Sequence, residues 1–266
     1  MGVIKNTLKR NFGKWTNPRF YTLLRLIANS TGKNAHKAGI AKADGMKIQY
    51  NDAKAYTGMY NEIILQEHYK FIPSKKSPLI IDCGANIGLS VLYFHKLVPD
   101  ARIIAIEADP DIAAILEQNV KANGCHAEII AKAAWTTDGE KISFGKAGAD
   151  AGSLYSLENT VTVETMRLKD LLDAQADIEL LKIDIEGAEI EVIKDCGASL
   201  AKADKIFVEF HSFPGKPQEL DVLLKILSDQ GFRYKILPAR RVEQPFMHMH
   251  DKDPMDVQLN IFFYKP

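Results

Sequence analysis

Blocks of apolar residues alternate with amphipathic stretches along the chain after residue 78. The apolar blocks are short, as in buried strands, and the stretches between them repeat their apolar residues at helical spacing. Strands are predicted at 79–81, 102–106, 127–130, 180–183, 206–210, 232–237 and 257–264. Helices are predicted at 87–97, 110–122, 187–195 and 217–229. This alternation predicts βαβ crossovers and a mostly parallel, doubly wound sheet.

Two departures from the regular alternation are also expected. The last two strands are joined by a long segment without a helical pattern, 238–256, so they are predicted to pair antiparallel. Between the third and fourth strands, 141–144 and 161–163 are predicted as further short strands.

The first 78 residues follow a different pattern. Residues 3–15 place apolar residues on one helical face, and Asn17-Pro18 reads as the start of a second helix at 18–29. Alternation and glycines within 38–58 predict a small hairpin, and a helix is expected at 59–70. We therefore divide the chain into a basic amphipathic helical extension (1–37), a hairpin and helix lid with its linker (38–78), and an α/β domain (79–266).

The composition is that of an ordinary soluble domain. The chain has 266 residues, of which 46% are hydrophobic and 26% charged. Its three cysteines form no C-x-x-C pair, which favours a reducing, cytoplasmic setting. No apolar run is long enough for a transmembrane helix, and the first residues lack the apolar core of a secretory signal.

The net charge of zero is the sum of two unlike parts. Residues 1–37 hold eight Lys or Arg and no acid, so the remaining chain has 26 basic and 34 acidic residues. The apolar face of this basic segment is expected to pack on the α/β domain or on a second subunit, as in a homodimer. The alternatives are a peripheral contact with an anionic membrane at its inner face and, less favoured, nucleic acid.

A glycine-rich turn follows the first strand of the α/β domain. Asp82-Cys-Gly84-Ala85-Asn86-Ile-Gly88 lies between an apolar strand and an amphipathic helix. An acid in this turn would repel the phosphates of a dinucleotide and suits a cationic ligand such as S-adenosylmethionine. Glu107 ends the next strand 23 residues after Gly84, where an acid can bind both hydroxyls of a ribose.

These motifs, together with Lys182-Ile-Asp184-Ile-Glu186-Gly-Ala-Glu189, resemble those of the FkbM-type methyltransferases. The resemblance covers about 59–264 and implies a class I, S-adenosylmethionine-dependent enzyme that methylates hydroxyls. It also implies a Rossmann-like seven-stranded sheet of order 3-2-1-4-5-7-6 with the last strand antiparallel. Departures are Cys83, where Val is commoner, and Ala108. The expected cofactor-binding residues are Asp82, Gly84, Ala85, Asn86, Glu107 and Asp184.

The candidate catalytic residues are Asp184, Glu186 and His211, which follow or end the fourth and fifth strands. His211 is the candidate base, because an unperturbed imidazole has a pKa near 6.5. Two alternatives stay open: Glu186 and Glu189 could instead stabilise the first helical turn, and the three candidates could hold a metal. We favour no metal.

Other candidates are weaker. His248 and His250 are expected in a surface or acceptor-recognition loop rather than in a metal site. Trp135 packs either on the adenine of the cofactor or in the core.

The expected function is O-methylation of a hydroxyl on a sugar, glycan or small metabolite. The chain lacks the Asp/Asn-Pro-Pro-aromatic run of amino-methylating enzymes, and none of its cysteines follows a proline, so DNA base methylation is disfavoured. The alternatives are an RNA methyltransferase that uses the basic N-terminus and a non-catalytic cofactor-binding module.

Overall fold

A seven-stranded sheet forms the centre of the computed structural model, which describes residues 17–145, 160–239, 244–247 and 255–266. Its strands lie in the order β11-β12-β10-β9-β3-β4-β5. Numbered along the chain, this order reads 3-2-1-4-5-7-6 from the opposite edge. Their bounds are β3 (Leu79–Cys83), β4 (Arg102–Ile106), β5 (Glu128–Ile130), β9 (Ile178–Ile183), β10 (Ala203–Ser212), β11 (Arg233–Pro238) and β12 (Val257–Tyr264). β12 is antiparallel to β10 and β11, and the other neighbours are parallel.

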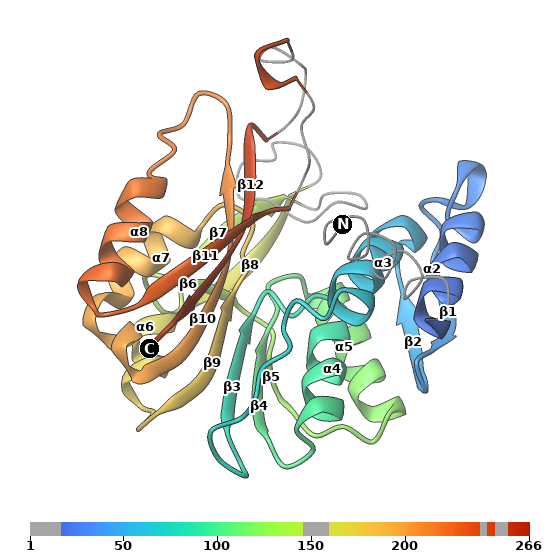
Figure 1. Cartoon of the computed structure of the whole chain (residues 1–266), viewed down its shortest axis with the longest axis horizontal. Coiled ribbons are helices and arrows are strands. Elements are labelled where there is room, and N and C mark those ends of the chain that lie inside the picture. Colours follow the sequence, from blue (N-terminus) through green and yellow to red (C-terminus); the bar gives the residue numbers. More distant parts are fainter. Residues whose placement is uncertain (1–16, 146–159, 240–243, 248–254) are drawn as a thin grey trace, which may run out of the picture.

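Helices cover both faces of this sheet, so the predicted α/β, doubly wound fold is confirmed (Figure 1). On one side lie α4 (Leu89–Leu97) and α5 (Pro110–Ala122). On the other lie α6 (Leu168–Asp173), α7 (Glu189–Cys196) and α8 (Leu220–Asp229). Because both faces are covered, every residue of β3 and β9 is buried, including the charged residues Asp82, Glu179 and Lys182.

The N-terminal elements pack on the α4 side of the sheet (Figure 1). They are α2 (Pro18–Asn29), η1 (Gly32–Asn34), the hairpin of β1 (Gly39–Ala43) and β2 (Met46–Tyr50), α3 (Ala53–Met59) and η2 (Tyr60–Leu65). Leu23, Ile48 and Tyr60 share one hydrophobic cluster with Phe94 of α4. The hairpin and the helix at 18–29 are confirmed, and the helix expected at 3–15 lies outside the described residues.

The helix predicted at 59–70 is wrong in its bounds. The helix begins at Ala53, where the Asp52 side chain accepts the N–H of Ala55, and a π-helical turn continues it to Leu65. The Arg19 guanidinium reaches this segment, donating to the Ile64 carbonyl and to Glu67. It also pairs with Asp44, so one charge of the basic segment is used within the fold.

A second, three-stranded sheet has the order β6-β8-β7. It comprises β6 (Ala133–Trp135), β7 (Lys141–Gly145) and β8 (Thr160–Arg167), so the short strands predicted in this region are confirmed. The sequence did not predict β6, α6 or the short 3-10 helices η3 (Gly197–Lys202) and η4 (Pro245–Met247). In the described ranges, no helix combines the length and apolar character needed to cross a membrane.

Candidate active site

The turn after β3 is in direct contact with the loop after β9. Gly84 has a φ of +81°, and a Cβ at this position would lie 1.8 Å from the backbone oxygen of Asp184. Only glycine fits both the left-handed conformation and the close approach. Asn86 is also left-handed, with a φ of +48°, and its side-chain oxygen accepts the N–H of Ile87. The two loops that the sequence singled out therefore meet at the carboxyl edge of the sheet.

Glu107 joins the turn after β3 to the loop after β4. Its Oε2 accepts the N–H of Asn86 at 2.8 Å, and its Oε1 accepts the N–H of Asp109 at 2.9 Å. Burial raises the pKa of Glu107 to about 7, although these two hydrogen bonds favour the carboxylate. Each carboxylate oxygen keeps a second lone pair, so both can still accept a hydroxyl.

Asp82, one of the predicted cofactor-binding residues, lies below the surface beneath this turn. Its side chain is fully buried; Oδ2 accepts the Ser90 hydroxyl at 2.5 Å, and Oδ1 lies 3.2 Å from the Lys182 ammonium. Lys182 also lies 3.1 Å from Asp184 and donates to the Gly84 carbonyl. Burial alone lowers the pKa of Lys182, but the two acids outweigh it and raise the pKa well above its usual value. The buried Lys182 thus pairs with the Asp82 carboxylate and links β3 to β9.

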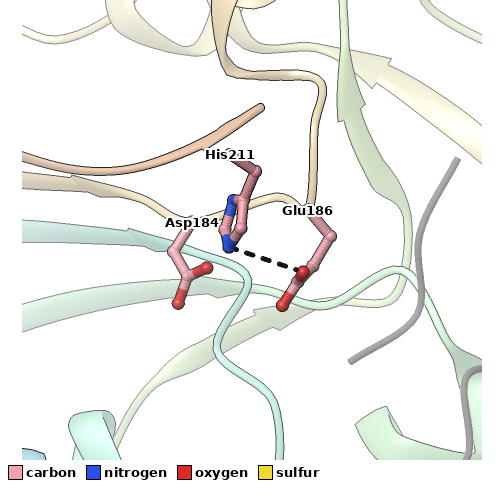
Figure 2. Close-up of side chains that lie close together, drawn as sticks. All are labelled: Asp184, Glu186 and His211. Atoms are coloured by element: carbon pink, nitrogen blue, oxygen red, sulfur yellow. Dashed lines mark ion pairs between the residues drawn. The ribbon is translucent and has the colours of Figure 1, made fainter. Parts of the chain in front are cut away.

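The three predicted catalytic residues lie together. One ligand-type atom from each of Asp184, Glu186 and His211 lies within 4.8 Å of the others. Figure 2 shows the His211 ring between the two carboxylates, with a nitrogen directed at Glu186. The His211 Nε2 lies 3.6 Å from Glu186 Oε2. Asp184 and His211, 27 positions apart in the chain, lie close together because β9 and β10 are parallel neighbours that end at the same edge.

Glu189 holds this cluster in place. Its Oε1 accepts the N–H groups of Ile185 and Gly187 and lies 3.0 Å from Nδ1 of His211. The alternative in which acids stabilise the start of this helix therefore applies to Glu189. Glu186 instead lies in the loop with a φ of +56°, a strained conformation for a residue with a side chain.

Burial and the charges within the cluster shift the pKa values of its members. Burial alone lowers the pKa of His211, but Glu189, Glu186 and Asp184 raise it well above 6.5. Burial raises the pKa of Glu186 well above its usual range and that of Glu209 to about 8. The ordinary imidazole value used to choose His211 as the base therefore does not apply, because the surrounding carboxylates favour the charged ring.

Three residues of the site had no assigned role in the sequence reasoning. They are Lys182, Glu209 and Gln258. The Gln258 amide donates to Glu209 Oε1 at 2.6 Å and lies opposite His211 in the β10–β12 register. Only the observed antiparallel register identifies Gln258. Trp135 packs partly buried against the core beside the sheet, and His248 and His250 lie outside the described residues.

Comparison with known proteins identifies the family. Residues 82–234, more than half of the chain, match the model of the methyltransferase FkbM domain. The chain belongs to the FkbM methyltransferase family. Methyltransferase sdnD of Sordaria araneosa is 30% identical over 175 residues, which cover 51% of this chain and 67% of that protein. The 2-O-methyltransferase NoeI of Sinorhizobium fredii is 27% identical over 158 residues, covering 51% of this chain and 64% of NoeI.

A solved FkbM methyltransferase from Methylobacillus flagellatus is 16% identical, with a TM-score of 0.45, and the match covers 80% of this chain and 53% of that one. Members of the FkbM family use S-adenosylmethionine, which is therefore the cofactor of this chain. The residues present fit it. Glu107 has free lone pairs for ribose hydroxyls, the turn at Gly84 has no Cβ to obstruct a ligand, and the nearby acids suit a cationic sulfonium.

Proposed function

We propose that this FkbM methyltransferase transfers the methyl group to a hydroxyl of a sugar, glycan or small metabolite. The observation that carries the proposal is the contact between the Gly84 turn and the Asp184 loop, because it sets the predicted cofactor residues beside a cluster of proton-exchanging groups. The name of the relative NoeI, a 2-O-methyltransferase, supports a hydroxyl acceptor.

Methyl transfer to an alcohol needs positioning and a route for one proton. S-adenosylmethionine supplies the electrophilic methyl group: the S–CH3 bond breaks as the O–CH3 bond forms, and S-adenosylhomocysteine leaves. The hydroxyl proton passes to the carboxylate–imidazole cluster, whose members lie close enough to influence one another's pKa values. In this proposal Asp184, Glu186 and His211 are the catalytic residues, and Gly84, Ala85, Asn86, Glu107 and Asp184 bind the cofactor. Asp82 acts indirectly, through Lys182.

The test is transfer of a labelled methyl group from S-adenosylmethionine to a panel of hydroxyl-bearing glycosides and small metabolites, with the product position assigned by NMR. We expect an O-methyl product. Asp184→Asn and His211→Ala should each lower turnover by about a hundredfold or more while far-ultraviolet circular dichroism stays unchanged. The matched control is Glu191→Gln, which removes an exposed acid from the same helix as Glu189 and should keep full turnover. Methylation of nitrogen or carbon only, or full turnover in both site variants, would refute the proposal.

A further inference from the structure

The side chains of Asp184, Glu186 and His211 have the arrangement of a metal-binding set. Their nearest ligand atoms all lie within 4.8 Å of one another, and Figure 2 shows the two carboxylates on either side of the ring. Ligands about 2.0–2.3 Å from a shared ion lie up to about 4.5 Å apart, so small side-chain rotations bring all three onto one ion.

The Nε2 atom of His211 is buried without a close hydrogen-bond partner. The His211 side chain is 1% exposed. Its contacts with side chains are long: a hydrogen bond with Gln258 Nε2 at 3.5 Å and an ion-pair distance to Glu186 Oε2 of 3.6 Å. Both distances exceed those of a good hydrogen bond, and buried ring nitrogens are normally satisfied. A cation between the ring and the carboxylates would give Nε2 a closer partner than either of these.

The other ring nitrogen already has the support that metal-binding histidines use. Nδ1 lies 3.0 Å from Glu189 Oε1, and the Glu189 side chain is itself 1% exposed. Histidine ligands commonly donate their second ring N–H to a carboxylate, which fixes the ring orientation and directs the free nitrogen at the ion. Glu189 is fixed in turn by the N–H groups of Ile185 and Gly187.

Carboxyl groups gather around the same point. Glu209 Oε1 lies 3.9 Å from His211 Nε2, so four carboxyl groups, with Asp184, Glu186 and Glu189, surround one ring. The buried Lys182 cannot balance them all, because it also pairs with Asp82. Buried carboxyl groups ionise readily only beside a compensating cation, so an ion at this point would be held by the charged forms of these side chains.

We propose that Asp184, Glu186 and His211 bind a divalent cation, with Glu189 orienting the histidine. Two carboxylate oxygens and one imidazole nitrogen suit an ion such as Mn²⁺. The catalytic use of the ion rests on the proposed function: it binds the acceptor hydroxyl and holds the oxygen beside the methyl group. The sequence favoured no metal, an expectation that remains untested, and the geometry points the other way.

The experiment is a titration of the full, chelator-treated chain with MnCl2, followed by calorimetry and electron paramagnetic resonance. Wild type should bind one Mn²⁺ per chain and show nitrogen coupling from an imidazole ligand. Glu186→Gln should weaken binding about tenfold or more, and His211→Ala should abolish the nitrogen coupling. Glu191→Gln should bind as wild type does. Thermal unfolding checks folding, since a given Mn²⁺ concentration should raise the Tm of wild type more than that of Glu186→Gln.

Absence of saturable binding at about millimolar Mn²⁺ would overturn the cation proposal, as would equal affinity and unchanged nitrogen coupling in the site variants. This outcome is separate from failure of the proposed function. O-methylation that persists in excess chelator would refute the catalytic use of the cation and leave the function intact. Specific Mn²⁺ binding without transfer to any hydroxyl would support the cation site and refute the function.

Discussion

Lys182 is the residue on which the charge balance of the sheet edge depends. Its ammonium lies 3.2 Å from Asp82 and 3.1 Å from Asp184, with both the lysine and Asp82 withdrawn from water. We expect Lys182→Met to lower the free energy of unfolding by about 3–5 kcal/mol, because it leaves buried carboxylates without a counter-charge. The measurement is equilibrium unfolding in urea.

A surface lysine provides the control for that substitution. Lys169 pairs with Asp173 one helical turn away, and both side chains are about a third or more exposed. Lys169→Met should therefore change stability by less than about 1 kcal/mol. If Lys182→Met lowers the free energy of unfolding no more than Lys169→Met does, Lys182 is not the counter-charge that stabilises Asp82 and Asp184.

We expect Glu107 to make cofactor binding depend on pH. Burial raises the pKa of Glu107 in the unliganded chain to about 7, and ribose hydroxyls donate best to the charged carboxylate. The carboxylate is therefore present above pH 7 and lost as the pH falls through this value. Affinity for S-adenosylmethionine should be constant above pH 7 and fall by up to about tenfold for each pH unit below it.

Calorimetric titrations between pH 5.5 and 8.5 would measure this dependence. Glu107→Gln, whose amide does not titrate, should bind weakly at every pH with a flat profile. A pH-dependent profile in Glu107→Gln that matches wild type would assign the titration to another group.

At the scale of elements, Asn119 of α5 and the C-cap residue Asn123 fix the β1–β2 hairpin to this helix. Asn119 is buried; its Oδ1 accepts the N–H of Gln49, and its Nδ2 donates to the carbonyls of Gln49 and Ile87. Asn119→Ala leaves these backbone groups unsatisfied and should cost about 2–4 kcal/mol in urea unfolding. Asn123 makes the equivalent pair with Lys47 at a more exposed position, so Asn123→Ala should cost about 1 kcal/mol or less. Equal costs would show that the burial of Asn119 does not matter.

Local signals determined which elements could be predicted. The helices that begin at Pro18 and Pro110 have their predicted bounds, since an Asn or Asp cap precedes each proline and its side chain accepts a backbone N–H. The π-helical turn at 60–65 has no comparable local mark, because tertiary packing of Tyr60 and Ile64 decides it. β6 has only three residues and shows no alternation.

At the scale of the whole molecule, the sequence predicts that Asp184 and Glu186 lie at the carboxyl edge of the sheet. It does not predict which side chains contact the acidic residues there. Strand order and the parallel direction of β9 and β10 were sufficient to bring His211 beside Asp184 and Glu186. The burial of Asp82 depends on Lys182 reaching across from β9, and the contact of Gln258 with Glu209 depends on the β10–β12 register. These contacts join residues far apart in the chain, and periodicity carries no information about them.

In our proposal, Glu107 with the turn after β3 and the Asp184–Glu186–His211 cluster are two ends of one active site. A crystal structure of the chain with S-adenosylhomocysteine tests this most directly. We predict that the ribose hydroxyls donate to the Glu107 carboxylate and that the sulfur faces the cluster. A complex in which the ribose binds away from Glu107, or in which the sulfur points away from Asp184 and His211, would contradict it.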